Sequence, residues 1–144
     1  MHIIRLDGNG AVTIGEAPEP TAGPGEVVIA TAVSALCGSE LHGYNTGGMG
    51  DGNNGHEAAG RIIQRGDGVT GLAIGQRVGV SAIAGCGICA YCAKGQYTWC
   101  RTFRFYGRMH AERFVVAANA CHALPDDVSW EAGVLLTGDG LGVP

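Results

Sequence analysis

The alternation of hydrophobic and polar residues divides the chain into short strand-like segments separated by glycine-rich turns. The first two segments, 1–6 and 11–14, flank Asp7-Gly8-Asn9-Gly10, a sequence suited to the positive φ values of a hairpin turn. Over 26–33 both alternating faces are apolar, which favours a strand in the interior of a sheet. The pattern therefore predicts a domain that opens with a hairpin and continues into a central strand.

Further β-branched segments bounded by glycine lie at 60–65, 76–80 and 113–117. A different pattern over 129–136 predicts a short helix with Ser129 as its N-cap. This set of elements favours a mainly β, barrel-like domain with short helices.

Two glycine-rich stretches match the G-x-G-x-x-G pattern, one over 50–55 and one over 66–71. A dinucleotide site of that type needs a helix directly after the glycines, because the pyrophosphate binds at the helix N-terminus. Neither stretch is followed by a helical pattern, so we interpret both as turns.

The length and composition of the chain predict a single domain and argue against nucleic-acid and membrane partners. A chain of 144 residues with 46% hydrophobic content predicts a single domain. The net charge of -4, with Lys and Arg scattered, argues against nucleic acid as a partner. No apolar run reaches the ~18 residues that span a bilayer, and no signal-peptide pattern follows Met1, so we expect no membrane partner and a cytoplasmic location.

Four of the six cysteines lie in one short stretch, which favours metal ligation over disulfides. Their spacing, C-x2-C-x2-C-x7-C, suits four thiolates around a structural zinc ion. Two alternatives to a zinc site are considered. The four cysteines could form two disulfides or remain free thiols, or they could bind an iron–sulfur cluster. Bacterial ferredoxins, however, place their fourth Cys after three residues and before Pro. The predicted lobe covers 85–101, and its ligands are Cys86, Cys89, Cys92 and Cys100.

A second, dispersed set of metal-ligating residues comprises Cys37, His56 and Asp139. A thiolate, an imidazole and a carboxylate leave one position open on zinc, which is typical of catalytic sites. Ser39 and His42 lie close enough to Cys37 in sequence to form a proton relay, and Glu40 could orient a ligand from outside the metal shell.

The motifs that carry this chemistry occur in the order seen in zinc-dependent medium-chain alcohol dehydrogenases, and the resemblance covers nearly the whole chain. They are CGSELH, GHEAAGRI, GDGVTGLAIGQRV, CGICAYCAKGQYTWC and HALPDDVSWEAGVLL. The resemblance implies that Cys37 and His56 bind catalytic zinc and that the four-Cys lobe binds structural zinc. It also implies that Ser39 and His42 form the relay, and that either Asp139 or Glu57 completes the catalytic site. The sequence departs from the family pattern at Glu40, where Asp is usual.

The resemblance further implies that residues 1–144 are a GroES-like β-barrel catalytic domain, without the Rossmann domain that binds NAD or NADP. An NAD(P)-linked enzyme of this kind acts on a small alcohol, polyol or carbonyl compound and forms homo-oligomers. We expect the isolated chain to be inactive, whether it is a truncation or half of a split enzyme. We also expect an apolar surface left uncovered by a later segment to promote self-association. The alternative is a non-catalytic, zinc-binding GroES-like interaction module.

Several other residues show no local pattern that predicts a role. His2 and His110 lack partners nearby in the sequence, and Cys121 is interpreted as an ordinary core or loop residue. The aromatic residues are expected to cover the metal lobe, although substrate contact by some of them stays open; they are Tyr91, Tyr97, Trp99, Phe103, Phe105 and Tyr106.

Overall fold

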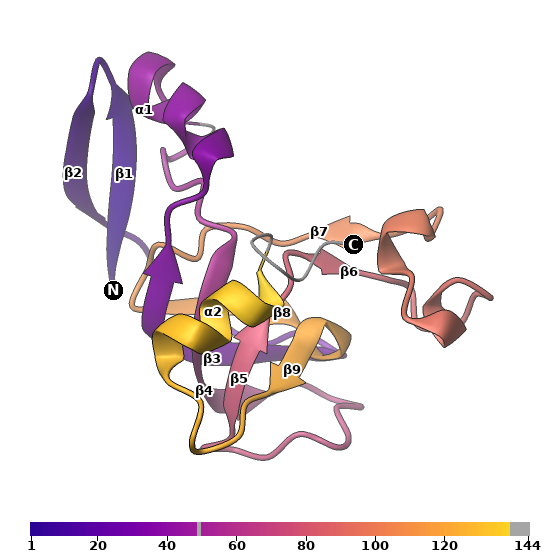
Figure 1. Ribbon diagram of the computed structural model, residues 1–144. Helices are drawn as coiled ribbons and strands as arrows, with labels where there is room; N and C mark the ends of the chain where they lie inside the picture. The colour runs from indigo at the N-terminus through magenta and orange to yellow at the C-terminus, as the bar shows by residue number, and fades with distance from the viewer. Residues whose placement is uncertain (49, 139–144) are drawn as a thin grey trace.

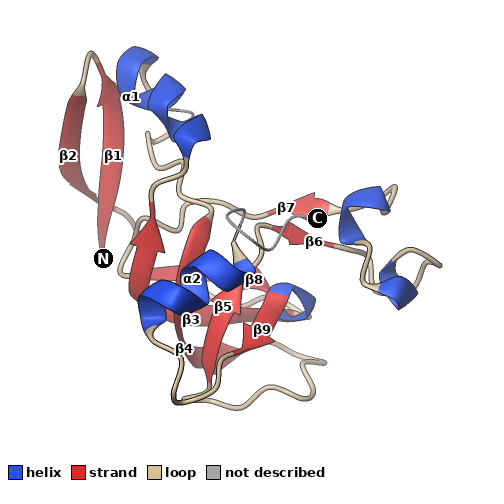
Figure 2. Ribbon diagram, in the orientation of Figure 1, coloured by secondary structure: helices blue, strands red, loops and turns tan. Residues whose placement is uncertain are grey.

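The fold was analysed in a computed structural model, which describes residues 1–48 and 50–138. These residues form a mostly β domain with two short α-helices (Figures 1 and 2). The strands are β1 (His2–Gly8), β2 (Ala11–Glu16), β3 (Glu26–Ala35), β4 (Glu57–Arg65), β5 (Arg77–Val80), β6 (Ile83–Ala84), β7 (Arg104–Phe105), β8 (Arg113–Ala117) and β9 (Cys121–Ala123). The helices are α1 (Leu41–Thr46) and α2 (Trp130–Thr137), with four single 3-10 turns at Gly38–Glu40, Cys92–Lys94, Tyr97–Trp99 and Ala118–Ala120.

The predicted opening hairpin is confirmed. Strands β1 and β2 pair antiparallel, and Gly8, Asn9 and Gly10 at the turn all have positive φ. Helix α1 packs beside β1, so the hairpin and α1 stand together at one end of the molecule (Figure 1).

The central sheet contains five strands in the order β8-β3-β4-β5-β9. Strand β3 is paired on both sides, as its two apolar faces predict. A flat five-stranded sheet would separate its outer strands by about 19 Å. The turn over 118–120 nevertheless connects β8 directly to β9, and it can span at most about 14 Å. The sheet must therefore curl, as a barrel-like domain requires.

The core is built from aliphatic side chains of the central sheet together with Phe114 and Met109. The largest fully buried side chains are Ile29, Ile62, Met109, Val27, Val28, Val78, Val80 and Val116. Neither glycine-rich match opens a helix, since 50–55 leads into β4 and 66–71 is a turn between β4 and β5. The interpretation of both as turns is confirmed.

Helix α2 is anchored on the sheet at its N-terminal end. Ser129 caps it as predicted, because its hydroxyl accepts a hydrogen bond from the backbone N–H of Ala132. Arg77 on β5 donates hydrogen bonds to the carbonyls of Pro125, Asp126 and Val128 at 2.6–3.0 Å. The Arg77 guanidinium also lies 4.2 Å from the ring centroid of Trp130. Arg77 therefore holds the segment that leads into α2 against strand β5.

One apolar surface is left open beside the hairpin. Val12 and Ile14 on β2 are 56% and 77% exposed, and a shallow groove runs from Val12 to Leu36 and Leu41. None of the helices among the described residues is long and apolar enough to cross a membrane.

Candidate metal centres

The four-Cys lobe projects from the domain on the two-stranded ribbon of β6 and β7 (Figure 1). Its backbone turns back on itself at Gly87 and Gly95, which both have positive φ. A side chain at Gly85 would place its Cβ only 2.4 Å from the Cys92 sulfur. Glycine is therefore needed at this position to let the chain approach the cysteine cluster.

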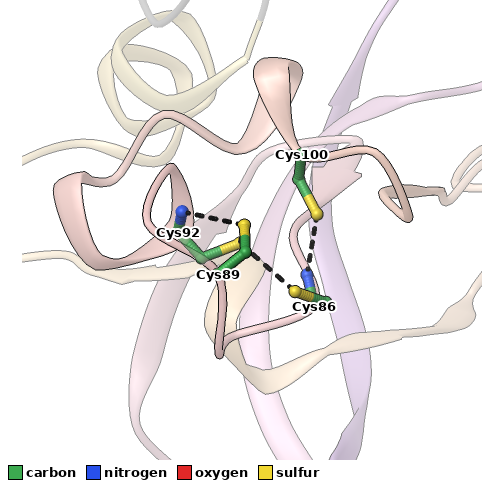
Figure 3. A group of neighbouring side chains, drawn as sticks. All are labelled: Cys86, Cys89, Cys92 and Cys100. Carbon is green, nitrogen blue, oxygen red and sulfur yellow. Dashed lines mark hydrogen bonds between the residues drawn. The ribbon is translucent and has the colours of Figure 1, made fainter.

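The four sulfurs of the lobe lie within 4.8 Å of one another and face a common centre (Figure 3). The Cys89 and Cys92 sulfurs are 3.5 Å apart, and those of Cys86 and Cys92 are 3.9 Å apart. Tetrahedral zinc with bonds of about 2.3 Å requires sulfurs about 3.8 Å apart. The donor set and its spacing therefore fit a closed zinc site, whereas a disulfide would need about 2.05 Å.

The surroundings of two lobe thiols shift their pKa values in opposite directions. A hydrogen bond from the backbone of Cys86, with further bonds from Thr102, lowers the pKa of the Cys100 thiol to about 6. Burial raises the pKa of Cys92 to about 11. Because ligation requires the thiolate, the raised pKa of Cys92 opposes metal binding and the lowered pKa of Cys100 favours it.

Cys37 and His56 are brought together by the pairing of β3 with β4. The last pair of this ladder is Ala35 with Glu57, so Cys37 leaves one strand where His56 enters the other. The Cys37 thiol and the His56 ring interact through a hydrogen bond. Two residues 19 positions apart therefore meet because one antiparallel register extends beyond the end of the sheet.

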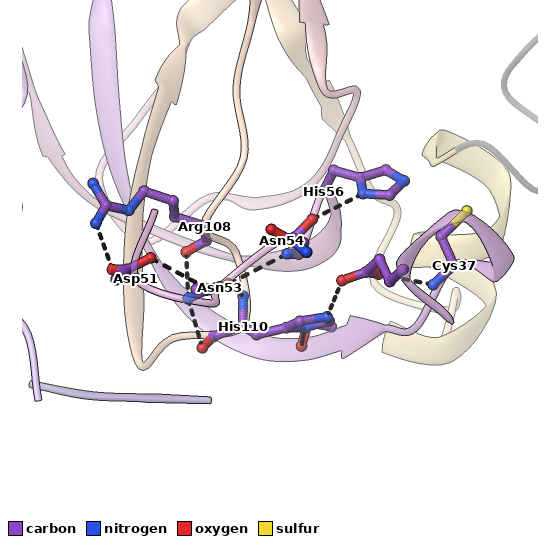
Figure 4. A network of polar contacts seen from close by, with 10 residues as sticks. Cys37, Asp51, Asn53, Asn54, His56, Arg108 and His110 are labelled. Atoms are coloured by element: carbon purple, nitrogen blue, oxygen red, sulfur yellow. Dashed lines mark hydrogen bonds and ion pairs between the residues drawn. The ribbon is translucent and has the colours of Figure 1, made fainter. Parts of the chain in front are cut away.

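The His56 ring is oriented for ligation. Its Nδ1 hydrogen-bonds the carbonyl of Asn54 at 3.1 Å, which leaves Nε2 on the side of Cys37 (Figure 4). Burial alone would lower the pKa of His56, but the bonds to Asn54 and Cys37 and the charge of Glu40 raise it. Hydrogen bonds from Ser39, and then His56, lower the pKa of Cys37. A thiolate and an oriented imidazole are donors that suit zinc.

The remaining predicted residues surround this pair to different degrees. Ser39 is exposed and hydrogen-bonds Cys37, whereas His42 is exposed on α1 and makes no hydrogen bond with Ser39. Glu57 is 8% exposed at the start of β4, and a Cβ at Gly138 would lie 3.1 Å from its Oε1. Asp139 lies outside the described residues.

The structure also contains a buried pair that has no local signature in the sequence. His110 Nε2 lies 2.8 Å from Glu40 Oε1, and these side chains are 6% and 1% exposed. Burial would raise the pKa of Glu40, but hydrogen bonds from His110 and from the Cys37 backbone lower it. His2 also has a distant partner, since its Nδ1 lies 3.2 Å from Glu112. Both histidines pair with residues that lie 70 or more positions away.

Unlike the other aromatic residues near the lobe, Phe105 lies beside His56. Its ring centroid is 6.0 Å from that of His56, and the side chain is 59% exposed. It therefore forms an apolar wall beside the Cys37–His56 pair in addition to flanking the lobe. Tyr106 packs against the core and donates a hydrogen bond to Glu26 at 2.9 Å, so it does not cover the lobe as predicted.

Residues 23–126 match the alcohol dehydrogenase GroES-like domain family. The chain is 32% identical over 139 residues to a sorbitol dehydrogenase of Bombyx mori, covering 89% of this chain and 40% of that protein. It is 31% identical over 154 residues to a probable zinc-binding alcohol dehydrogenase of Mycobacterium tuberculosis, covering 95% and 38%.

The structure superposes on galactitol-1-phosphate dehydrogenase from Escherichia coli with a TM-score of 0.79 at 32% identity. That comparison covers 94% of this chain and 41% of the other. The chain thus spans 40% or less of the length of the two relatives named above. Family match, relatives and fold agree, and the chain belongs to the zinc-dependent medium-chain alcohol dehydrogenase family, in which it corresponds to the N-terminal GroES-like domain.

Proposed function

We propose that this chain is the zinc-binding catalytic half of an NAD(P)-linked dehydrogenase that oxidises an alcohol or reduces a carbonyl compound. The observation that carries the proposal is the meeting of Cys37 and His56 at the open end of the β3–β4 ladder. When bound, zinc would act as a Lewis acid that lowers the pKa of an alcohol hydroxyl. The hydride would pass to or from a nicotinamide held by another part of the enzyme.

Cys37 and His56 would supply two of the zinc ligands, and an acid would supply the third. Asp139 is the first choice, because the resemblance to zinc-dependent dehydrogenases implies a metal-binding acid at this position. Glu57 is the alternative, since its carboxylate is already at the start of β4, next to His56. Either acid leaves a position for substrate oxygen.

Ser39 and His42 would move the substrate proton outward. Ser39 hydrogen-bonds the Cys37 sulfur, and His42 is exposed in the first turn of α1, which follows the 3-10 turn that contains Ser39. A hydroxyl beside the site and an imidazole at the surface are the two ends of a short relay, which a water molecule or the substrate itself would join.

A polyol is the substrate class that relatives favour, since the two named above with defined substrates act on sorbitol and galactitol-1-phosphate by their names. Phe105 would contact the carbon chain on the side of His56. The complete enzyme would be a homo-oligomer. Residues 1–144 would form the GroES-like domain, and a Rossmann domain elsewhere would hold NAD or NADP.

Metal content tests the proposal most directly. We expect two zinc ions per chain, of which one is lost in Cys37→Ser or His56→Ala and the other in Cys92→Ser. A single zinc that persists in Cys37→Ser would favour the alternative, a non-catalytic GroES-like module held together by its lobe. Iron in place of zinc would contradict both.

Activity gives a second test. The isolated chain should show negligible dehydrogenase activity, because nothing described in it positions a nicotinamide against a substrate carbon. Rapid NAD-dependent turnover of an alcohol by this chain alone would contradict the proposal that the nicotinamide is bound by another part of the enzyme. Activity that arises only on mixing with a separate nucleotide-binding chain would identify a split enzyme.

A further inference from the structure

His110 lies at the centre of a buried polar network next to the Cys37–His56 pair (Figure 4). Its Nδ1 is 2.9 Å from the Ser34 hydroxyl on β3, and its Nε2 is 2.8 Å from Glu40. Its backbone N–H donates to the Asn53 side chain at 3.2 Å. Both ring nitrogens are therefore engaged, and the ring has one fixed orientation.

Glu40 connects His110 to the first ligand. Its Oε1 bonds the His110 ring, while its Oε2 accepts a hydrogen bond from the backbone N–H of Cys37 at 2.9 Å. The carboxylate thus bridges the two groups. Aspartate, usual at this position in the family, is one methylene shorter, so the longer Glu40 side chain is what spans this gap.

Gly55 connects His110 to the second ligand, since it directly precedes His56. A Cβ at Gly55 would lie 2.5 Å from the His110 backbone nitrogen and 2.6 Å from its ring, so the imidazole packs directly on this glycine. Asn53 holds both segments, because its Oδ1 accepts from Gly55 N–H and from His110 N–H. His110 therefore contacts the supports of both ligands.

We propose that His110, acting with Glu40, is a positioning residue that fixes Cys37 and His56 relative to each other and so sets the affinity and geometry of their metal site. This inference rests on the proposed function, in which these two residues are ligands. The physical reason is that a metal site binds tightly only when its ligands are held in place before the ion arrives. Groups that orient ligands typically contribute about 10–100-fold to metal affinity.

Cobalt binding to the metal-free chain tests the inference, because Co²⁺ occupies zinc sites and its visible spectrum reports ligand identity and geometry. His110→Phe removes both ring nitrogens but keeps an aromatic ring, and His110→Gln keeps a donor for Glu40 without the ring. Glu40→Asp removes one methylene. The matched control is His2→Phe, which breaks an exposed His–Glu pair on β1. The four-Cys lobe is an internal reference in every variant.

We expect His110→Phe and Glu40→Asp each to weaken cobalt binding at the Cys37–His56 site by about 10–100-fold and to alter its spectrum. The lobe spectrum and the His2→Phe variant should match the wild type. His110→Gln should recover most of the loss, and His110→Phe combined with Glu40→Asp should be little worse than either change alone. If His110→Phe does not fold, His110→Gln and Glu40→Asp decide the question.

Wild-type affinity and spectrum in both His110→Phe and Glu40→Asp would overturn the inference. A lower melting temperature with unchanged cobalt binding would also overturn it, because that result describes a purely structural pair. Failure of the proposed function is a separate outcome: the wild-type chain itself would then bind metal only in its lobe.

Discussion

At the scale of single residues, Gly55 shows how a residue without a side chain contributes to the site. The His110 backbone and ring occupy the space that a Cβ would need, and the Gly55 carbonyl accepts a hydrogen bond from Met109 N–H at 2.9 Å. The φ angle of Gly55 is not positive, so the requirement for glycine is one of space and not of backbone conformation. A methyl group there would have to move two chain segments apart.

Gly55→Ala should lower the free energy of unfolding by about 1–3 kcal/mol, because overpacking in a filled site forces such a shift. The measurement is denaturant unfolding of the purified chain. Gly38→Ala is the matched control, since nothing lies within 4 Å of its Cβ position, and it should change stability by less than about 0.5 kcal/mol. Equal stabilities for the two variants would contradict the proposed contact.

At the scale of elements, the strands with clear alternation were predicted from the sequence, and the very short ones were not. The opening hairpin, β3 and the Ser129-capped helix are long enough for their hydrophobic and capping patterns to be recognised in the sequence. Strands β6 and β7 have two residues each and α1 has six, which is too few for a periodicity to stand out. The four-Cys cluster was predictable because its ligands are close in sequence. The pairing of His110 with Glu40 was not, because only the fold brings these residues together.

Helix α2 depends on an arginine that lies on another element. The Arg77 side chain is 10% exposed, donates to three carbonyls and stacks on Trp130, so its removal takes away three hydrogen bonds and this stacking contact. Arg77→Ala should therefore lower the free energy of unfolding by about 1.5–3 kcal/mol. Arg65→Ala is the control: Arg65 also lies on β4 and bonds a single exposed carbonyl, that of Leu72, but it is not stacked on Trp130 as Arg77 and Arg61 are. A loss as large in Arg65→Ala would argue against a specific anchor.

The lobe should lose its order with its metal while the sheet stays folded, since few large side chains hold it and Ile88 and Trp99 are 93% and 69% exposed. Treatment with a zinc chelator should accelerate tryptic cleavage after Lys94 and Arg101 at least about tenfold, because local order is what protects such sites. Mass spectrometry of the fragments measures this, with cleavage after the sheet residue Arg61 as the reference. Equal acceleration at Arg61 would show that the whole domain unfolds.

At the scale of the whole molecule, the described residues form a curled sheet with two projections, the hairpin with α1 and the lobe (Figure 1). The exposed apolar side chains of β2 and the groove next to them agree with the expectation of an uncovered surface. Exposed apolar surfaces of this kind promote association or bind another segment of protein.

Sedimentation velocity should therefore show concentration-dependent self-association of the isolated chain. Ile14→Glu should reduce it, because a charge would then have to be desolvated at the contact. Ile74→Glu, which alters an exposed residue in a loop far from β2 in sequence, is the control and should have little effect. A chain that stays monomeric at high concentration would rule out this surface as a contact.

The anchor of α2 has a mechanical consequence. Arg77 and Trp130 hold one end of an eight-residue helix, and Gly138 at the other end touches Glu57. The helix is about 12 Å long, so a tilt of roughly 5° at the anchor would displace the far end by about 1 Å. Substitutions around Arg77 should therefore reach Glu57, the acid beside His56, through the position of the helix and not by direct contact.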